Sequence, residues 1–331
     1  MMEGEVKKKG MFHMFVVSTF ELQDPNLAED LKKSFPEVTF EFFKKVSEIP
    51  KEKLKHAEII LTYGNLTTDH INIAENLKWI MVASAGVERM PLNMIEEKKI
   101  LVTNARGIHK IPMAEYTIAM MLQVARNSKK LIENERNCLW DRTIEKMELN
   151  GKTIAILGVG AIGGEIARLA KAFRMKTLGI TRTSKQVEFV DEIYSLAELD
   201  EVLPQADFVV SVLPSTKETK HVLKHKQFQL MKDNSVFINI GRGDVVAEEI
   251  LLKALELKEI SHAVLDVFET EPIDEDHPFW KMENVTVTPH LSSVTKGYQP
   301  RALQIFKHNL NVYLKNENAD FINMIDLERG Y

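Results

Sequence analysis

The amino-acid sequence predicts an α/β protein made of two doubly wound domains, each with a parallel sheet covered by helices. Short apolar runs alternate with amphipathic stretches along nearly all of the 331 residues, which is the pattern of a parallel sheet with crossover helices. A fresh strand–helix series begins at Gly151. The length corresponds to two domains of roughly 150 residues each. These three observations together predict the fold class.

The first series fills about the first hundred residues and leads into a long helix. Amphipathic patterns predict helices at residues 27–34, 66–74 and 112–126. The predicted strands are residues 12–18, 38–42, 58–62, 79–82 and 100–103.

The second series is a doubly wound unit in its own right. Its predicted helices are residues 163–173, 196–203 and 247–257, and a further helix at 300–314 follows it. Its predicted strands are residues 153–157, 176–180, 208–213, 235–239, 263–267 and 285–287.

Charge and composition exclude several classes of protein. The 43 Lys and Arg residues against 48 Asp and Glu give a formal net charge of −5, whereas nucleic-acid-binding proteins usually present a basic face to the phosphates. A hydrophobic share of 44% is typical of a globular chain. Cys138, the single cysteine, cannot form an internal disulfide and is interpreted as structural rather than nucleophilic. We expect a cytosolic protein that binds neither nucleic acid nor membrane.

The N-terminal residues imitate a signal peptide only in part. Three lysines at 7–9 precede an apolar run at 11–20, as the basic and apolar regions of a signal do. His13 interrupts the run, however, and Glu21 stands where a cleavage site would follow. A buried first strand is therefore the preferred interpretation.

A glycine motif directly follows the first strand of the second series. Gly158, Gly160 and Gly163 have the spacing Gly-x-Gly-x-x-Gly. The first glycine allows a tight turn, the second lets the backbone approach a pyrophosphate, and the third lets the helix pack closely on the strand. Free N–H groups at the start of that helix attract the phosphates. Ala161 and Ile162, between the second and third glycines, are also predicted to bind the cofactor. The motif predicts a dinucleotide site.

The loop after the next strand indicates which dinucleotide is bound. NAD-binding domains usually carry Asp or Glu there, which binds the ribose 2′-hydroxyl, but no carboxylate occurs between Met175 and Val187. Cations and hydroxyls suit a 2′-phosphate instead, although an ordinary solvated basic loop is the alternative. We predict NADPH in preference to NADH. The residues that would bind it are Thr181, Arg182, Thr183, Ser184 and Lys185.

Polar residues follow three further strands, at the sheet edge where open α/β proteins bind ligands. Arg242 follows one strand, Asp266 lies at the end of another that Glu271 follows, and His290 follows the last. Taken singly, each has a plain explanation, such as a helix cap or an acidic loop. Together they suggest a catalytic set.

This set and its surroundings resemble the D-isomer-specific 2-hydroxyacid dehydrogenase family over nearly the whole chain. The resemblance implies a Rossmann cofactor domain at residues 104–292. It also implies a flavodoxin-like substrate domain made of residues 1–103 and 293–331, and a homodimer formed through the helix from Pro112 and the segment to Trp140. The matching segments are Ser84-Ala85-Gly86-Val87, Met113-Ala114-Glu115-Tyr116, Glu148-Leu149-Asn150-Gly151-Lys152-Thr153, the glycine motif, Leu213-Pro214-Ser215-Thr216, Arg242-Gly243, Glu271-Pro272 and Pro289-His290.

The resemblance implies NADPH-dependent reduction of a small 2-ketoacid, such as glyoxylate or hydroxypyruvate, to the D-2-hydroxyacid. Arg242 is suited to bind the carboxylate and the carbonyl oxygen, because its guanidinium is permanently charged and forked. His290 is suited to donate the proton, because histidine titrates in the right range. Glu271 would orient the imidazole and stabilise its charged form. The reaction needs no metal.

Other residues complete the predicted sites. By the resemblance, the backbone N–H groups of Ala85 and Gly86 would bind the substrate carboxylate. Tyr63, which follows the third strand, is predicted to face the substrate, with a simple turn as the alternative. The remaining cofactor residues predicted are Pro214, Thr219, Ile240 and Asp266, the last on the nicotinamide carboxamide side.

A rival prediction belongs to a different class of protein. A dinucleotide-sensing protein could keep the fold and use the cofactor as a conformational switch, because fold does not fix function. The intact set of Arg242, Glu271 and His290 favours the enzyme, since a sensor needs no proton donor.

Overall fold

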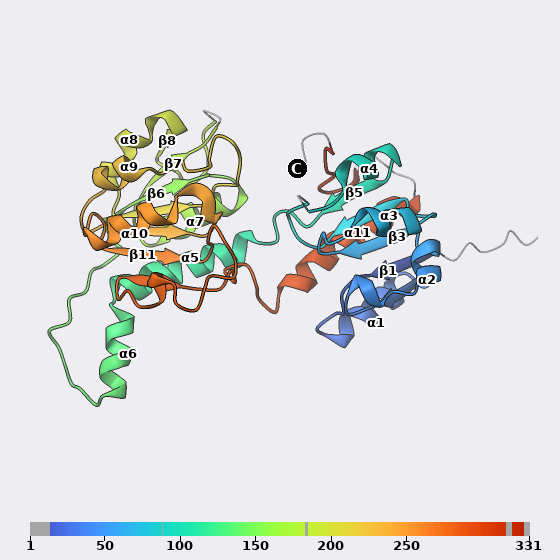
Figure 1. Ribbon diagram of the computed structural model, residues 1–331, viewed down its shortest axis with the longest axis horizontal. Coiled ribbons are helices and arrows are strands. Elements are labelled where there is room, and N and C mark those ends of the chain that lie inside the picture. The colour runs from blue at the N-terminus through green and yellow to red at the C-terminus, as the bar shows by residue number, and fades with distance from the viewer. Residues whose placement is uncertain (1–13, 88, 183–184, 316–319, 328–331) are drawn as a thin grey trace, which may run out of the picture. The chain divides into compact units, whose positions relative to one another are not determined.

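The computed structural model describes residues 14–87, 89–182, 185–315 and 320–327 (Figure 1). The chain divides into two compact units. The first comprises the residues up to Ile108 together with those from Lys296, and the second is His109–Thr295. Each unit holds one sheet in which all the described strand pairs run parallel. The predicted α/β class with two parallel sheets is confirmed.

The first unit is a five-stranded sheet with the order β2-β1-β3-β4-β5. This is the flavodoxin-like order, in which the winding direction reverses between β1 and β3. The strands are β1 (Met14–Ser18), β2 (Val38–Phe42), β3 (Ile59–Thr62), β4 (Trp79–Val82) and β5 (Leu101–Asn104). The helices are α1 (Pro25–Ser34), α2 (Lys51–His56), α3 (Thr68–Ile73), α4 (Leu92–Glu97) and α11 (Tyr298–Lys315), with a 3₁₀ turn at Val46–Glu48.

Helices cover both faces of this sheet, because alternate strand residues point to opposite sides. On one face, Trp79 packs with Leu31 of α1 and Phe306 of α11. On the other, Ile80 packs with Ile71 of α3 and other residues of α2 and α4. All residues of β3 and β4 are buried, because helices cover both faces. The two strands therefore have nearly continuous apolar sequences instead of an alternation of apolar and polar residues.

The second unit is a seven-stranded sheet with the order β12-β11-β10-β9-β6-β7-β8. Counted from β6, this is the Rossmann order with one added strand. The strands are β6 (Thr153–Leu157), β7 (Lys176–Ile180), β8 (Glu192–Tyr194), β9 (Phe208–Ser211), β10 (Val236–Asn239), β11 (His262–Leu265) and β12 (Val285–Val287). The helices are α5 (Lys110–Ala125), α6 (Ser128–Arg136), α7 (Ala161–Ala172), α8 (Leu199–Val202), α9 (His225–Leu230) and α10 (Glu248–Glu256), with 3₁₀ turns at Leu196–Glu198, Leu203–Gln205, Gly243–Val245 and Pro278–Trp280.

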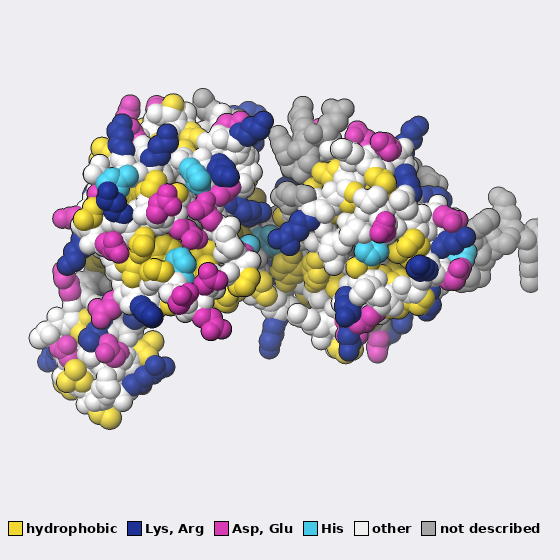
Figure 2. All heavy atoms as spheres, in the orientation of Figure 1, with side chains coloured by type: hydrophobic (Ala, Val, Ile, Leu, Met, Phe, Trp, Pro, Cys, Tyr) yellow, Lys and Arg dark blue, Asp and Glu magenta, His cyan; other side chains and the backbone are white. Residues whose placement is uncertain are grey.

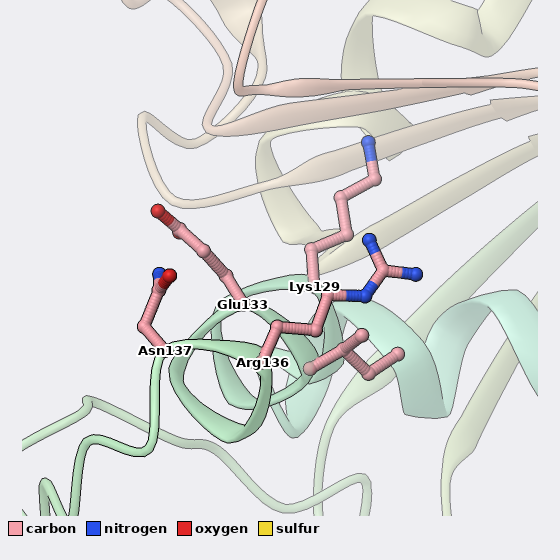
Figure 3. Close-up of a pocket in the computed structure, with 5 residues that line it drawn as sticks. Lys129, Glu133, Arg136 and Asn137 are labelled. Atoms are coloured by element: carbon pink, nitrogen blue, oxygen red, sulfur yellow. The ribbon is translucent and has the colours of Figure 1, made fainter.

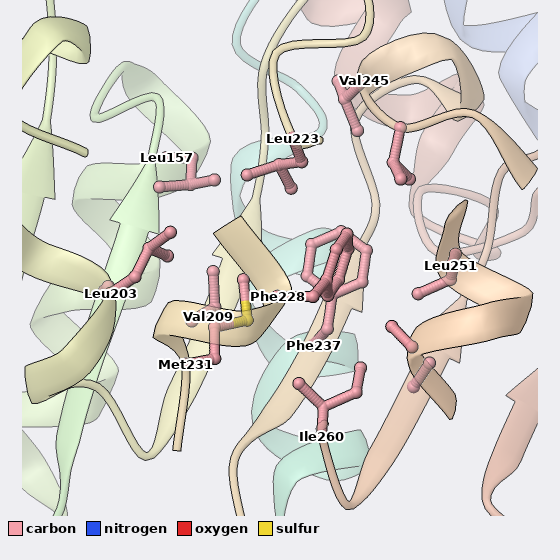
Figure 4. Close-up of a cluster of buried hydrophobic side chains, with 14 of the residues drawn as sticks. Leu157, Leu203, Val209, Leu223, Phe228, Met231, Phe237, Val245, Leu251 and Ile260 are labelled. Atoms are coloured by element: carbon pink, nitrogen blue, oxygen red, sulfur yellow. The ribbon is translucent and has the colours of Figure 1, made fainter. Parts of the chain in front are cut away.

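Two apolar clusters hold this second sheet between its helices. Ile154 and Ile156 of β6 face α5 and α7, whereas Ala155 and Leu157 face the side covered by α8, α9 and α10. Figure 4 shows the second cluster, in which the rings of Phe228 and Phe237 cross edge to face with centroids 5.7 Å apart. Aromatic pairs favour this geometry. Both faces of the sheet are therefore buried against apolar side chains, so polar residues that bind ligands are expected at the strand ends.

Several predicted elements need correction. The strand predicted at 208–213 ends at Ser211, and the helix predicted at 196–203 is one turn of α-helix between two 3₁₀ turns. The helix predicted at 163–173 begins at Ala161, so it starts inside the glycine motif. Phe12 and His13 of the first predicted strand lie outside the described residues. Cys138, predicted to be structural rather than nucleophilic, is an exposed free cysteine.

Candidate active site

The glycine motif forms the turn between β6 and α7, and its three glycines differ in environment. Gly158 has φ of +102°, which side chains other than hydrogen rarely tolerate. A Cβ on Gly163 would lie 2.3 Å from the carbonyl oxygen of Gly158, so α7 can approach β6 only without one. Apart from neighbouring residues along the chain, no heavy atom of the described residues lies within 4 Å of a Cβ placed on Gly160. These environments match the turn, the close packing and the open phosphate approach that the motif predicts.

The open position at Gly160 lies at the N-terminus of α7, where Gly160 is the N-cap. Ala161 and Ile162 open the helix, and the N–H groups of its first turn lack helical partners. Among the described residues there is no side-chain cap at this end. The residues present therefore fit a dinucleotide, whose pyrophosphate takes N–H donors at a helix N-terminus.

The loop after β7 carries the predicted 2′-phosphate residues. Arg182 and Lys185 are exposed and Thr181 is half-buried, whereas Thr183 and Ser184 lie outside the described residues. A hydrogen bond from Thr216 is the main cause that lowers the pKa of Glu218, and the charge of Arg182 adds to it. Arg182 thus lies close enough to the loop after β9 to act on its charges.

The loop after β9 contains the predicted cofactor residues Pro214 and Thr219. The Thr219 hydroxyl donates to the carbonyl oxygen of Pro214 at 2.5 Å, and the side chain accepts the N–H of Thr216 at 2.9 Å. Thr219 is buried and closes this turn from within. Ile240, also predicted, is buried at the end of β10 in the apolar cluster that faces α5 and α7.

Arg242 follows β10 with an exposed side chain. Its Nη1 donates to the carbonyl oxygen of Gly241 at 2.9 Å, and among the described residues it forms no ion pair with a carboxylate. A Cβ on the next residue, Gly243, would lie 1.9 Å from the carbonyl carbon of Phe268. The backbone that carries Arg242 therefore lies directly against the loop after β11, where Glu271 is found.

Glu271 and His290 are brought together, although 19 residues separate them in sequence. His290 Nδ1 lies 2.8 Å from Glu271 Oε2, and Glu271 Oε1 accepts the backbone N–H of Phe268 at 3.1 Å. The imidazole side chain stays 51% exposed. Because Nδ1 is hydrogen-bonded to Glu271, Nε2 is the ring nitrogen that can exchange a proton with a bound ligand. A carboxylate that orients an imidazole in this way is the usual arrangement of an acid–base histidine.

Asp266 holds the loop that carries His290 in place through hydrogen bonds to its backbone. It is fully buried. Its Oδ1 accepts the N–H of Leu291 at 2.9 Å and its Oδ2 that of Ser292 at 3.0 Å. Its own carbonyl oxygen accepts the N–H of His290 at 2.9 Å. Asp266 is therefore placed to position His290, a role that the sequence prediction of a cofactor contact did not include.

Two residues that sequence reasoning missed extend this network. Thr288 donates to Asp266 Oδ1 at 2.6 Å, and its Oγ1 lies 2.7 Å from the hydroxyl of Tyr116 on α5. Burial is the main cause that raises the pKa of Tyr116 to about 12, so the phenol keeps its proton and donates to Thr288. The resemblance had brought Tyr116 into a matched segment, and Thr288 directly precedes another, but nothing in the sequence paired a helix with a loop 172 residues away.

In the first unit, three predicted substrate residues lie together. A Cβ on Gly64 would lie 3.3 Å from the carbonyl oxygen of Gly86, and Ser84 Oγ donates to the carbonyl oxygen of Tyr63 at 3.4 Å. Within the described part of the chain, the N–H groups of Ala85 and Gly86 donate to no acceptor. Two adjacent free N–H groups are suited to an anion.

The structure supplies no metal site or membrane helix in the parts it describes. No group of three or more His, Cys, Asp or Glu residues among the described ones could hold a metal ion. None of the helices in the described ranges is long and apolar enough to cross a bilayer. On the face in view, basic and acidic side chains are interspersed (Figure 2).

A scan against family models matches residues 118–292 to the NAD-binding domain of D-isomer-specific 2-hydroxyacid dehydrogenases. The chain is 35% identical to a D-3-phosphoglycerate dehydrogenase of Methanocaldococcus jannaschii over 81% of its own length. It is 33% identical to a glyoxylate reductase of Thermofilum pendens, with 80% of this chain and 79% of that protein covered. The chain spans about half the length, 52% and 48%, of the phosphoglycerate dehydrogenases of Methanocaldococcus jannaschii and Archaeoglobus fulgidus.

A solved structure from Aeromonas salmonicida, described as a D-isomer-specific 2-hydroxyacid dehydrogenase family protein, is similar over both units. It has a TM-score of 0.85 and 30% sequence identity, and the match covers 95% of this chain and 99% of that one. The sequence match and the fold therefore agree along nearly the whole chain.

Proposed function

The chain belongs to the D-isomer-specific 2-hydroxyacid dehydrogenase family, and from this premise we propose that it reduces a 2-ketoacid to the D-2-hydroxyacid with NADPH. The observation that carries this proposal is the 2.8 Å contact between Glu271 and the half-exposed imidazole of His290. Glyoxylate, hydroxypyruvate and similar acids are the proposed substrates. The names of several relatives, glyoxylate reductases, support this choice.

Each residue has a role that follows from its chemistry. The bound dinucleotide would supply the hydride for C2 of the ketoacid. Arg242 carries a permanent charge, its backbone lies against the loop of Glu271, and it would bind the carboxylate and the carbonyl oxygen. His290 delivers a proton from Nε2 to that oxygen while Glu271 holds Nδ1. The free N–H groups of Ala85 and Gly86 are donors of the kind that a carboxylate takes.

The preference for NADPH is supported by the loop after β7. No carboxylate occurs between Met175 and Val187, and the described cations Arg182 and Lys185 are exposed there. An exposed guanidinium binds a 2′-phosphate in forked geometry. Arg182→Asp should therefore raise KM for NADPH and lower it for NADH, and a wild-type protein that prefers NADH would contradict the assignment.

The experiment that tests the reaction is a panel of 2-ketoacids assayed with both cofactors. We expect NADPH oxidation with at least one acid and formation of the D-hydroxyacid, identified by chiral chromatography. Tight NADPH binding without turnover of any acid would instead favour a dinucleotide sensor.

A homodimer is the proposed assembly, formed through α5 and the segment from α6 to Trp140. α6 projects from the second unit (Figure 1) and carries a pocket of about 350 Å³ lined by Lys129, Ile132, Glu133, Arg136 and Asn137 (Figure 3). Trp140 is 90% exposed, and Leu131, Ile132 and Leu139 are exposed as well. So many exposed apolar side chains on one arm mark an interaction surface. Light scattering should report a dimer for the wild type and a monomer for Trp140→Glu with Ile132→Glu.

A further inference from the structure

The loops that follow β1 and β3 meet at the point where the first sheet reverses its winding. The strand order β2-β1-β3-β4-β5 places β1 and β3 side by side. In open α/β sheets, the crevice outside the carboxyl ends of such strands is where ligands bind. Phe20 lies two residues after β1 and Tyr63 directly after β3. Their rings stack with centroids 4.0 Å apart and an interplanar angle of 25°.

Tyr63 is held in place from several directions. Gln299 of α11 is buried and donates from Nε2 to the Tyr63 hydroxyl and to the carbonyl oxygen of Glu21, both at 3.1 Å. Its Oε1 accepts the N–H of Gln23 at 2.7 Å. The Tyr298 ring meets Tyr63 edge to face at 6.1 Å. The amide of Gln299 thus locks Tyr63 to the loop after β1.

Although it is locked, Tyr63 stays 40% exposed. Phe20 covers one face of its ring, so a ligand can reach the ring only from its other face or from an edge. Burial raises the pKa of the Tyr63 phenol, which therefore stays uncharged in neutral buffer. A fixed, neutral aromatic plane at a strand end is a surface on which a flat apolar group gains contact without an ordering cost to the protein.

The plane adjoins the two free N–H groups described above. Tyr63 and Gly64 contact the Ser84–Gly86 turn through the Ser84 hydroxyl and through the close approach of Gly64 to Gly86. The loops after β1, β3 and β4 thus place an anion site and an aromatic surface next to each other within one unit. The anion site is suited to a carboxylate and the aromatic surface to an apolar ring, so a ligand that carries both groups would fit.

We propose that the Tyr63 plane binds the side chain of a 2-oxo acid that carries an aromatic ring, while the Ala85–Gly86 N–H groups take its carboxylate. This inference rests on the proposed reductase function and specifies its substrate class. Glyoxylate has only hydrogen at C2 and leaves the plane uncovered, whereas phenylpyruvate covers it. The prediction is a preference for aryl over small 2-oxo acids.

The test compares kcat/KM for phenylpyruvate and glyoxylate in the wild type, Tyr63→Ala and Tyr63→Phe. We expect the wild type to prefer phenylpyruvate. Tyr63→Ala should reduce this preference by about ten- to a hundred-fold, as burial of a ring against a ring implies. Tyr63→Phe keeps the plane and should keep most of the preference. A wild-type preference for glyoxylate, or equal losses with both acids in Tyr63→Ala, would overturn the inference.

Calorimetry separates this inference from the proposed function. Phenyllactate binding is measured in the wild type and in Tyr63→Ala, with thermal unfolding as a check that both are folded. Weaker binding in Tyr63→Ala supports the aromatic site even if no acid is reduced, in which case only the reductase assignment fails. Equal phenyllactate binding by the two proteins, together with glyoxylate turnover, overturns the aromatic site and leaves the reductase intact.

Discussion

At the scale of single residues, the position of His290 depends on groups that would never touch a substrate. Its backbone has φ of +50°, in the left-handed region, which residues other than glycine adopt uncommonly. Hydrogen bonds from its N–H to the carbonyl oxygens of Asp266 and Thr288 help to hold it there. The imidazole is therefore oriented by Glu271 through its ring and by Asp266 through its backbone.

Removing the Thr288 hydroxyl tests this positioning. Thr288→Val keeps the side-chain shape but breaks the link from Tyr116 to Asp266. We expect kcat for ketoacid reduction to fall by about ten- to a hundred-fold, because small misplacements of reacting groups have effects of this size. The Kd for NADPH should stay within about twofold, since a positioning role acts after cofactor binding.

Thr286→Val is the matched control for that variant. Thr286 lies on β12, two residues before Thr288, and its hydrogen-bond partners, Gln123 and His262, do not belong to the His290 loop. Both variants should lose about 1–2 kcal/mol of unfolding free energy, whereas only Thr288→Val should lose kcat. Equal effects on kcat in the two variants would show that the loss is merely structural.

The sequence identified the candidate catalytic residues but not the groups that hold them in place. Arg242, Glu271 and His290 could be placed because each follows an apolar strand, and the carboxyl ends of parallel strands share one edge. The contacts of Tyr116 with Thr288 and of Gln299 with Tyr63 could not be predicted. Helical periodicity tells which face of a helix is buried but not which loop packs on it.

At the scale of elements, the β6–α7 turn allows the effect of a glycine on folding stability to be separated from its effect on cofactor binding. Gly160 has φ of −93° and an open Cβ position, so Gly160→Ala should fold with an unfolding free energy within about 1 kcal/mol of the wild type. The added methyl group would stand where the backbone approaches a pyrophosphate. We expect the Kd for NADPH, measured by fluorescence titration, to rise by about tenfold or more, as overpacking of a site implies.

Gly164→Ala serves as the control in the same helix. A Cβ there meets only the Val187 side chain at 3.9 Å. Alanine should stabilise α7 by roughly 0.5–1 kcal/mol and leave the Kd unchanged. A normal Kd for Gly160→Ala would mean that the pyrophosphate does not lie over this turn.

His262 at the start of β11 makes folding sensitive to acid. Burial, with a smaller effect of the Lys129 charge, lowers its pKa from 6.5 to about 4. Between these values the unfolded chain binds a proton that the folded chain does not, so this contribution to stability is complete above pH 6.5 and is lost as the pH falls toward 4. The loss reaches up to about 3 kcal/mol.

Urea unfolding of the wild type and His262→Gln at pH 7.5 and 4.5 measures that contribution. We expect the wild type to lose more unfolding free energy between the two pH values than the variant does. Identical losses would show that His262 is solvated enough to protonate freely in the folded state.

Strands and helices with a strong apolar pattern were predicted well, whereas elements with few buried apolar residues were missed. β6, β7 and β12 have the predicted bounds because they are short apolar runs between clear breaks. α6 was missed because the only buried residue of Ser128–Arg136 is Asn134, which gives no apolar stripe. The edge strand β8 has three half-buried residues, too few for an alternating pattern.

At the scale of the whole molecule, two parallel sheets of different topology divide the chemistry between them. The sheet with Rossmann order carries the glycine turn, Arg242 and the Glu271–His290 pair at its strand ends. The sheet with flavodoxin-like order carries Tyr63 and the free N–H groups of Ala85 and Gly86 at its own. One places the proposed hydride and proton chemistry, and the other the proposed recognition of the acid.

The most direct test of this account is kcat for reduction of the best 2-ketoacid by His290→Ala, measured beside the Kd for NADPH. We expect kcat to fall by about 10²-fold or more, because the proton donor is lost, while the Kd for NADPH stays nearly unchanged. An unchanged kcat would contradict the assignment of His290 as the proton donor and with it the central claim.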